Sequence, residues 1–289
     1  MAKTIGIIGA SGWLGGHLTT ALREFGYSVV GFSRSQRSGS HEWRVWNAKG
    51  DFDLSGIDAV INLAGEAIDQ RWLDSTKKAF HESRVVLTED LVKSMNKHQV
   101  PFLLNASAVG YYGDRGNDEL LEAEPPAENY LAQLCVDWEV ATAGANSKVC
   151  LLRTGVVLGK GGRAWVKMSK VFKLGVGGKL GSGKQWMPWI HLADEIGAIL
   201  HCLEKEIEGA VNLVAPESVT NAAFTKAVGL EMNRPTVFAA PAFVLKLALG
   251  DFAEEGLLAS QRVIPQVLLE SGYQFQFPEI SDALRDLCY

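Results

Sequence analysis

The glycine pattern near the start of the chain constrains the fold more than any other feature. Residues 4–8, Thr-Ile-Gly-Ile-Ile, form a short β-branched run typical of a buried parallel strand. The run leads directly into residues 9–15, where glycines recur as Gly-x-x-Gly-x-x-Gly at the start of an apolar-periodic helix. In such a turn Gly9 permits a tight bend, Gly12 lets a ligand approach the backbone, and Gly15 lets the helix pack on the strand. The pattern predicts a pyrophosphate bound at the amino terminus of that helix.

The helix after this turn completes the unit. Residues 14–25 place apolar side chains on one helical face, and Gly26 follows where a left-handed C-cap is expected. Strand, turn and helix therefore occur in the order that a nucleotide-binding site requires, although a purely structural turn also favours glycine. We expect the phosphate contacts to come from Gly9, Ser11, Gly12, Trp13, Leu14 and Gly15.

The second predicted strand, residues 27–34, indicates which dinucleotide binds. A cofactor with a free ribose 2'-hydroxyl is usually held by an Asp or Glu at the end of this strand. Here the strand ends in Ser33 and Arg34, with Arg37 close behind and no carboxylate. A hydroxyl and a guanidinium suit a 2'-phosphate, so the sequence favours NADP(H) over NAD(H). The alternative for Arg34 is a solvated loop cation.

Two further apolar runs predict strands that reach the same edge. Residues 57–65 read as a continuous buried strand that ends in small and polar residues, where ligands bind in an open parallel sheet. We expect four of these to line the cofactor, namely Asn62, Leu63, Ala64 and Gly65. The alternative is that the small residues only allow tight packing. Residues 101–107 predict the next strand, which ends in the hydroxyl of Ser107.

Strands and helices continue to alternate. A long helix is predicted at 75–97, another at 128–143, and the sixth strand at 149–153. This order implies right-handed crossovers and an α/β fold with a doubly wound parallel (Rossmann) sheet. We expect residues 1–155 to form an NADP(H)-binding Rossmann domain. Residues 156–289 are expected to form a smaller C-terminal α+β substrate lobe, from which later segments can return to the first domain.

The C-terminal tail is expected to be ordered. Pro265 lies near a predicted helix start and Gly272 beyond its end. Residues 273–277 alternate apolar and polar side chains and predict a strand, and residues 281–287 predict a last helix.

Composition excludes several functional classes. With a net charge of -5 over 289 residues, general nucleic-acid affinity is not expected. No apolar run approaches the length that spans a bilayer, so no membrane partner is expected. The first strand begins almost at the start of the chain and leaves no room for a signal peptide, which predicts a cytoplasmic protein. The four cysteines are scattered and the histidines lack ligand spacing, so no metal site is expected. A monomer or a homodimer is expected.

Charge is unevenly distributed along the chain. Residues 155–193 carry seven Lys or Arg and no Asp or Glu, so the rest of the chain sums to -12. The basic residues are Lys160, Arg163, Lys167, Lys170, Lys173, Lys179 and Lys184. This patch predicts an anionic substrate or partner, and the alternatives are a solvated amphipathic helix and, less favoured, a membrane-surface helix.

A glycine-rich loop at 175–183 precedes Trp186 and Trp189. The two indoles could form a stacking wall of a pocket, or they could join the second lobe to the first. His191 and Asp194 flank the start of the next helix, and Asp194 is interpreted as a helix-start residue.

These motifs together resemble a known family. The segments that carry the resemblance are residues 9–15, 62–65, 107–113 and 189–194. They are similar to an extended short-chain dehydrogenase/reductase of the NAD-dependent epimerase/dehydratase group. Gly65-Glu66, Arg71-Trp72, Ser83-Arg84 and the tail at 261–265 and 283–287 resemble an atypical epimerase-like subfamily with its own C-terminal domain. The resemblance spans nearly the whole chain and implies a Rossmann fold and an NADP(H) site, to which Arg84, Ala106 and Thr154 also contribute.

The resemblance implies a catalytic pair with one member of the usual set missing. In the family a Ser or Thr holds the substrate oxygen and a Tyr transfers a proton, while a Lys four residues later lowers the pKa of that Tyr. Here the pair is Ser107 and Tyr130, but the lysine position is Leu134. A Tyr without a nearby cation keeps a pKa of about 10 and is a poor base at neutral pH.

Alternatives remain open at these positions. A different alignment of the loop puts Ala108 where the hydroxyl is expected, and Tyr130 could be only a packed helix residue. A replacement proton donor or oxyanion partner could come from Tyr111, Tyr112 or Arg153.

Two hypotheses follow. The first is an NADP(H)-binding, epimerase-like oxidoreductase that acts by hydride transfer on a small anionic carbonyl or hydroxyl compound, for example a nucleotide sugar. The second is a catalytically degenerate NADP(H)-binding regulatory or scaffold protein, in which cofactor binding orders the loop at 175–183.

Overall fold

A parallel sheet of seven strands forms the centre of the part that the computed structural model describes, residues 2–39, 41–46 and 51–289. Its strands, in spatial order, are β12 (Gly209–Leu213), β7 (Lys148–Thr154), β5 (Phe102–Ala108), β4 (Ala59–Asn62), β1 (Thr4–Ile8), β2 (Ser28–Ser33) and β3 (Glu42–Val45). Every neighbouring pair is parallel. This is the predicted doubly wound Rossmann sheet, and the carboxyl ends of its strands meet at one edge.

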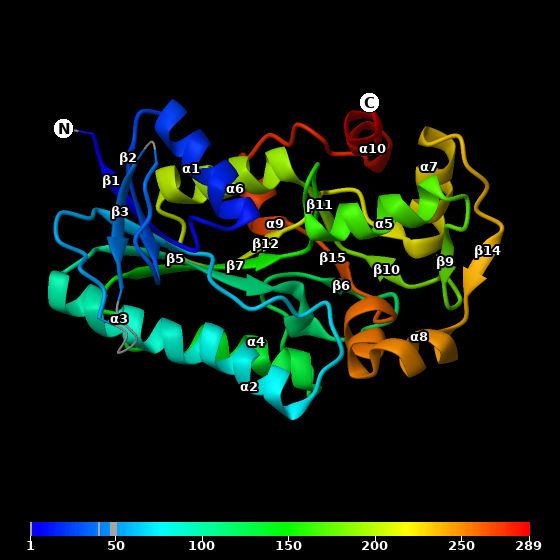
Figure 1. The fold of residues 1–289 in the computed structure, drawn as a ribbon, viewed down its shortest axis with the longest axis horizontal. Helices are drawn as coiled ribbons and strands as arrows, with labels where there is room; N and C mark the ends of the chain where they lie inside the picture. Colours follow the sequence, from blue (N-terminus) through cyan, green and yellow to red (C-terminus); the bar gives the residue numbers. More distant parts are fainter. Residues whose placement is uncertain (1, 40, 47–50) are drawn as a thin grey trace.

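Helices cover both faces of the sheet (Figure 1). One face carries α1 (Trp13–Glu24), α6 (Leu192–Lys205) and α9 (Gln266–Glu270), and the other carries α3 (Leu87–His98) and α4 (Tyr130–Val140). Leu18 and Leu22 of α1 are fully buried against strand residues such as Ile7. Burying a side chain of this size stabilises a fold by roughly 1.5–3 kcal/mol.

The predicted long helix at 75–97 is present but is not uniform. Its first part is α2 (Asp74–His81), which passes through a π-helical turn, η1 (Glu82–Val86), into α3 without a break. Single π-helical turns inside longer helices occur frequently at functional sites.

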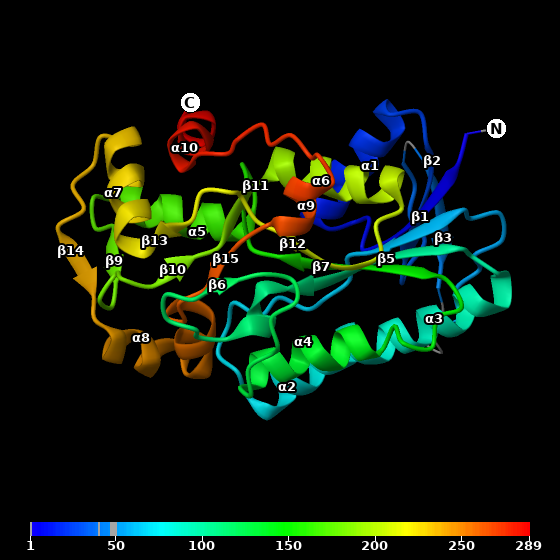
Figure 2. The ribbon, with the colours of Figure 1, turned by 180° about the vertical axis from the view of Figure 1, so that it is seen from behind.

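The second lobe packs beyond the carboxyl edge of the sheet (Figure 2). Its helices are α5 (Arg163–Lys173), α7 (Asn221–Glu231), α8 (Ala242–Leu249) and α10 (Ile280–Cys288). Its short strands pair as β8 (Val156–Leu158) with β11 (Trp189–His191), β9 (Gly178–Leu180) with β14 (Phe238–Ala240), β10 (Trp186–Met187) with β13 (Val219–Thr220), and β6 (Glu119–Leu120) with β15 (Arg262–Val263). The lobe is α+β, as predicted. Two elements from beyond residue 155 return to the Rossmann domain: β12 is a strand of its sheet, and α6 covers one face of that sheet. The division of the chain at residue 155 stays a proposal.

The predicted strand at 273–277 is wrong, since these residues lie in irregular backbone. The physical reason is a carboxylate on α6. Asp194, fully buried, accepts hydrogen bonds from the Tyr273 hydroxyl and from the backbone N–H groups of Gln276 and Phe277. The alternating pattern therefore reflects alternate side chains that pack inward. The backbone N–H groups bond to the Asp194 side chain where those of a strand would bond to a neighbouring strand.

Among the described residues, no helix is long and apolar enough to cross a bilayer. The same residues contain no cluster of three or more His, Cys, Asp or Glu that could bind a metal ion.

Candidate functional site

The turn between β1 and α1 has the geometry of an anion site. Gly9 adopts a φ of +89°, which L side chains rarely adopt, and its carbonyl accepts the Gly12 N–H at 2.9 Å. A Cβ at Gly15 would lie 2.2 Å from the Gly9 oxygen, so only glycine fits there. Helix α1 begins without a side-chain cap and has no acidic residue in its first turn. Its first N–H groups are therefore free to bind an anion.

The end of β4 forms the neighbouring wall of this site. A Cβ at Gly9 would lie 3.1 Å from the Leu63 carbonyl carbon and 3.2 Å from the Ala64 nitrogen, so the two loops touch. Asn62 lies fully buried beneath them, where its amide donates to Thr88 and to Asn105. The Asn62 side chain thus supports the loop from within the protein, and the surface of the wall is backbone.

Trp13 connects the turn to the second lobe. Its indole N–H donates to the Lys160 carbonyl at 3.1 Å. A Cβ at Gly159 or Gly162 would lie 2.7 or 2.6 Å from its ring, so both glycines are needed for this packing. The Trp13 side chain therefore positions the lobes, while its backbone N–H belongs to the free helix terminus.

A basic cluster lies at the end of β2. The Ser33 hydroxyl, buried, accepts the Arg37 Nε–H at 3.1 Å and the Ser35 N–H at 3.2 Å. Arg34 is exposed and forms no hydrogen bond or ion pair with any residue that the structure describes. The Ser33 hydroxyl donates its proton to the Ser35 carbonyl at 2.7 Å and so positions Arg37, and the two guanidinium groups are available to an anion at the outer end of the site.

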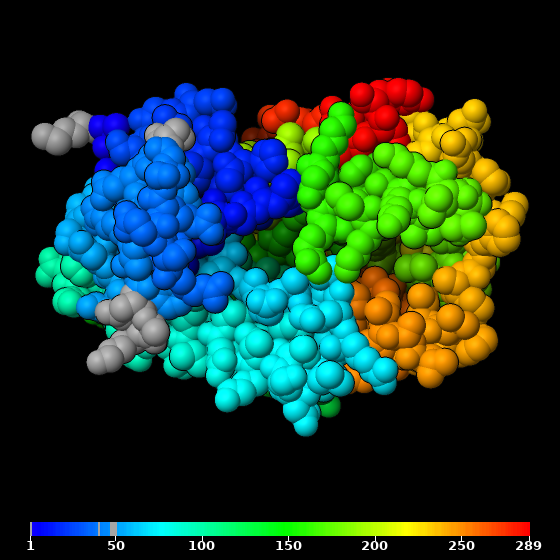
Figure 3. Space-filling view, viewed as in Figure 1, coloured from blue at the N-terminus to red at the C-terminus, as the bar shows by residue number. Residues whose placement is uncertain are grey.

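The loop after β4 closes over the same side of the molecule. Asp69 pairs with Arg163 at 2.7 Å and also with Lys167, both on α5. Figure 3 shows a hollow bordered by the blue N-terminal segment, the cyan loop after β4 and the green segment that contains α5. Two cations of the predicted anion-binding patch therefore share one carboxylate within the protein, which lowers the net positive charge of the patch by one.

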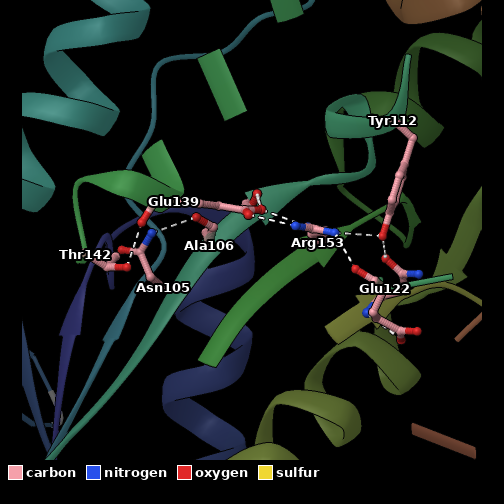
Figure 4. Close-up of polar contacts among 9 residues, drawn as sticks. Asn105, Ala106, Tyr112, Glu122, Glu139, Thr142 and Arg153 are labelled. Atoms are coloured by element: carbon pink, nitrogen blue, oxygen red, sulfur yellow. Dashed lines mark hydrogen bonds and ion pairs between the residues drawn. The ribbon is translucent and has the colours of Figure 1, made fainter. Parts of the chain in front are cut away.

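Ser107, the predicted oxygen-binding residue, belongs to a buried polar network. It is 4% exposed, and its hydroxyl donates to Glu139 Oε1 at 2.6 Å. Glu139 in turn forms two hydrogen bonds of 2.8 Å with the guanidinium of Arg153 (Figure 4). The only proton of the Ser107 hydroxyl is thus donated inside the protein, and the group can only accept further hydrogen bonds.

The network continues from Arg153 toward the C-terminal region. The Arg153 guanidinium donates to the Tyr112 hydroxyl at 3.0 Å and to the Glu122 carbonyl at 3.0 Å, as Figure 4 shows. Tyr112, fully buried, donates to Asn212, and burial raises the pKa of Tyr112 to about 12. Burial likewise raises the pKa of Glu122, whose carboxyl accepts the N–H groups of Asn212 and Val267. These residues link β7, β12 and the tail, and their polar groups are occupied by the hydrogen bonds that form this link.

Tyr111 differs from its neighbour. It is partly exposed, and the Arg153 guanidinium carbon lies 3.5 Å from the centroid of its ring. Its hydroxyl forms no hydrogen bond with the described residues. Of Tyr111, Tyr112 and Arg153, the three groups considered as a replacement proton donor or oxyanion partner, Tyr111 is the one with a hydroxyl still available.

Tyr130 is the first residue of α4, beyond the N-cap Asn129. Its hydroxyl is 3.4 Å from the Lys77 carbonyl, and its ring centroid is 5.3 Å from that of Trp72. Burial raises the pKa of Tyr130, and the charge of Arg84 opposes this effect. Leu134 is 4% exposed and packs in the same apolar cluster, which Ala106 also contacts. Ser107 and Tyr130 therefore contact different partners: Ser107 bonds to Glu139, and Tyr130 contacts the Lys77 carbonyl and Trp72.

One residue that the sequence reasoning missed is Glu195. It is 1% exposed, and its carboxyl accepts the Thr154 hydroxyl at 3.0 Å while its second oxygen has no partner among the described residues. Burial raises the pKa of Glu195 to about 8. An acid inside an apolar helix could have been noticed, but sequence does not say which face it occupies. Thr154, a predicted cofactor contact, is thus also bound to Glu195.

The two tryptophans of the second lobe have separate roles. Trp189 is 1% exposed within the apolar core of the lobe. Trp186 donates to Asn117 and lies 5.0 Å from the Arg262 guanidinium. Next to it is a cavity of about 530 Å³, whose lining includes Asn117, Lys184 and Lys246. His191 caps α6 by accepting the Ala193 N–H, and Asp194, in the first turn of that helix, holds the tail.

The sheet order, the glycine turn and the free helix terminus define a Rossmann-type nucleotide-binding protein with an added α+β lobe. The human epimerase family protein SDR39U1, crystallised with NADPH, superposes with a TM-score of 0.93 at 34% identity, over 99% of each chain. A nucleoside-diphosphate sugar epimerase from Corynebacterium glutamicum gives a TM-score of 0.80 at 32% identity and covers 100% of this chain and 59% of that one. In sequence, epimerase family protein Mb2239 of Mycobacterium bovis is 42% identical over 97% of this chain and 96% of its own length.

Residues 5–214 match the NAD dependent epimerase/dehydratase family, and residues 240–287 match a domain of unknown function, DUF1731. The chain belongs to the NAD-dependent epimerase/dehydratase family, in a branch that carries this C-terminal domain. The predicted resemblance is confirmed.

Proposed function

We propose that the chain binds NADP(H), with the pyrophosphate at the turn between β1 and α1 and the 2'-phosphate at the end of β2. The carrying observation is the cluster of Ser33, Arg34 and Arg37, which has two guanidinium groups and no carboxylate where a free ribose hydroxyl would need one. The glycine turn fits a pyrophosphate because α1 begins without a side-chain cap or an acidic residue in its first turn, which leaves its first N–H groups for an anion. NADPH in the crystal structure of human SDR39U1 supports the same reading.

We further propose an epimerase-like oxidoreductase that acts on a small anionic carbonyl or hydroxyl compound, of which nucleotide sugars are one class. When bound, NADP(H) supplies or accepts a hydride at the substrate carbon. The chain must then bind the substrate, exclude water and move one proton at the substrate oxygen. Ser107 can accept a hydrogen bond from a substrate hydroxyl but has no proton left to donate to a carbonyl.

The proton carrier in this proposal is a tyrosine. Tyr130 has the position that the family resemblance indicates, and Tyr111 has the free hydroxyl. An anionic substrate would be attracted by those cations of the second lobe that form no ion pair with any described residue, among them Lys184 at the cavity beside Trp186.

A second candidate function is favoured by specific observations. Leu134 is buried and apolar where a lysine would assist the tyrosine, and Ser107 is occupied by Glu139. A protein that binds NADP(H) for regulation, or as a scaffold, needs neither group.

Oxidation of NADPH against a panel of carbonyl compounds and sugar nucleotides, followed by absorbance, distinguishes the two. Turnover with any member supports the oxidoreductase. Tight binding without turnover, unchanged in the Leu134→Lys variant, supports the regulatory protein.

A further inference from the structure

Arg84 is a cation without a carboxylate partner. It lies in the π-helical turn η1, and its Nη2 donates to the Glu66 carbonyl at 2.8 Å. Its guanidinium carbon is 5.1 Å from the Trp138 ring centroid and 5.9 Å from that of Phe80. No carboxylate of the described residues lies within ion-pair distance, and burial lowers the pKa of the guanidinium. A partly buried cation of this kind needs an anion or several hydrogen-bond acceptors.

The loop that Arg84 supports is the wall of the proposed cofactor site. The Ser83 hydroxyl accepts the Glu66 N–H at 2.9 Å, so two adjacent residues of η1 bind both the N–H and the carbonyl of one loop residue. A Cβ at Gly65 would lie 3.1 Å from the guanidinium carbon and from Nη2. Any side chain at position 65 would therefore crowd the guanidinium next to the end of β4.

The order of the sheet determines which part of a dinucleotide reaches this point. The cluster around Ser33 lies on β2, the glycine turn follows β1, and Gly65 follows β4, which is the next strand in the sheet. A dinucleotide with its 2'-phosphate at β2 and its pyrophosphate at β1 extends over β4 toward β5 with its nicotinamide half. Arg84 is therefore beside the ribose and phosphate of that half.

The same guanidinium lies against the face of α4 that lacks a lysine. Tyr130, Leu134 and Trp138 recur every four residues and share one face of α4. Arg84 packs on Trp138 at the far end of this face, and its charge also acts on Tyr130 at the near end. Two cations reach this face from outside α4. Lys77 Nζ lies 4.6 Å from the Tyr130 ring centroid but pairs with Asp251, whereas Arg84, from η1, has no carboxylate of the described residues within ion-pair distance.

We propose that Arg84 binds the nicotinamide-side ribose and phosphate of NADP(H), in place of a lysine at position 134. This inference rests on the proposed NADP(H) site. It assigns a reason to the π-helical turn, which directs Arg84 toward Gly65, and to Gly65, which leaves room for it.

The test compares two ligands in titrations of the full chain. NADPH carries the nicotinamide half, and 2',5'-ADP lacks it. Arg84→Met should weaken NADPH binding by roughly 10- to 100-fold, the loss expected for hydrogen bonds to a charged group, and should leave 2',5'-ADP affinity unchanged. Arg84→Lys should retain part of the NADPH affinity. Leu134→Lys added to Arg84→Met should restore part of it.

Arg71→Met is the matched control, because Arg71 is an exposed cation of the same loop, and it should change neither affinity. Unchanged NADPH binding in Arg84→Met, or an equal loss of both ligands, would overturn the inference. If Arg84→Met fails to fold by circular dichroism, the folded Arg84→Lys variant decides by the same two-ligand comparison: unequal losses support the inference, and equal or absent losses overturn it. Failure of the unmodified chain to bind either ligand would instead refute the proposed function.

Discussion

Two adjacent glycines of α1 offer a sharp test of the phosphate turn. A Cβ at Gly15 would lie 2.2 Å from the Gly9 oxygen and 2.9 Å from the Ala10 Cα, both of them backbone atoms that no rotamer change can move. A Cβ at Gly16, the next residue of the same helix, would meet nothing within 4 Å. The two substitutions to alanine therefore add the same atom and differ only in what it contacts.

The expected effects have opposite signs. Gly16→Ala removes the helix penalty of glycine and should raise the free energy of unfolding by about 0.5–1 kcal/mol. Gly15→Ala gains the same amount but forces α1 away from the strand, and overpacking of this kind costs about 1–3 kcal/mol or more. Moving α1 also displaces the N–H groups of its first turn, so NADPH binding should fall by at least tenfold in Gly15→Ala and stay unchanged in Gly16→Ala.

Urea unfolding measures the stability, and tryptophan fluorescence measures NADPH binding. If Gly15→Ala proved as stable and as tight in binding as Gly16→Ala, the described packing of the turn would be wrong.

Three further predictions concern buried carboxyls and the proton carrier. Asp194→Ala leaves the backbone N–H groups of Gln276 and Phe277 without their acceptor, while the Tyr273 hydroxyl keeps the backbone carbonyl of residue 194, and should lower the free energy of unfolding by roughly 1–3 kcal/mol; limited proteolysis should cut the tail faster, and unchanged cleavage would contradict the role given to Asp194. Burial raises the pKa of Glu195 from 4.5 to about 8, so the folded state holds a proton that the unfolded state releases, and stability should fall as pH rises between these values; Glu195→Gln should remove that dependence in urea titrations, and an unaltered pH profile would refute it. If turnover is found, Tyr111→Phe or Tyr130→Phe should lower kcat by about 100-fold or more, which identifies the proton carrier, whereas two active variants would exclude both tyrosines.

Local features were predictable from the sequence. The β1 strand, the glycine turn and α1 lie within one short segment, and their signals come from neighbouring residues. The doubly wound parallel sheet followed from the alternation of strands and helices together with the handedness of crossovers. The family resemblance was found on these motifs and is confirmed over nearly the whole chain.

The hydrogen-bond partners of the polar residues were not predictable in the same way. Ser107 and Glu139 are 32 residues apart, and Tyr112 and Asn212 are 100 apart, so no local pattern indicates that they meet. The cationic segment looked free for a ligand because Asp69, which pairs with two of its members, lies 94 residues before Arg163.

The second lobe was the hardest part to derive. Its strands have only two or three residues, and β6 pairs with β15 across more than 140 positions of sequence. The tail at 273–277 has the alternation of a strand but finds its hydrogen-bond partner in the Asp194 side chain. Period-2 patterning reports which side chains face inward and does not report what satisfies the backbone.

The central claim is that the cluster at the end of β2 selects a 2'-phosphate. Titration of the chain with NADPH and with NADH, monitored by tryptophan fluorescence, tests it most directly, with the double variant Arg34→Ala and Arg37→Ala in parallel. NADPH should bind about 10- to 100-fold more tightly than NADH, and the double variant should lose this preference while its NADH affinity is unchanged. Equal affinity for the two cofactors, or no binding of either, would contradict it.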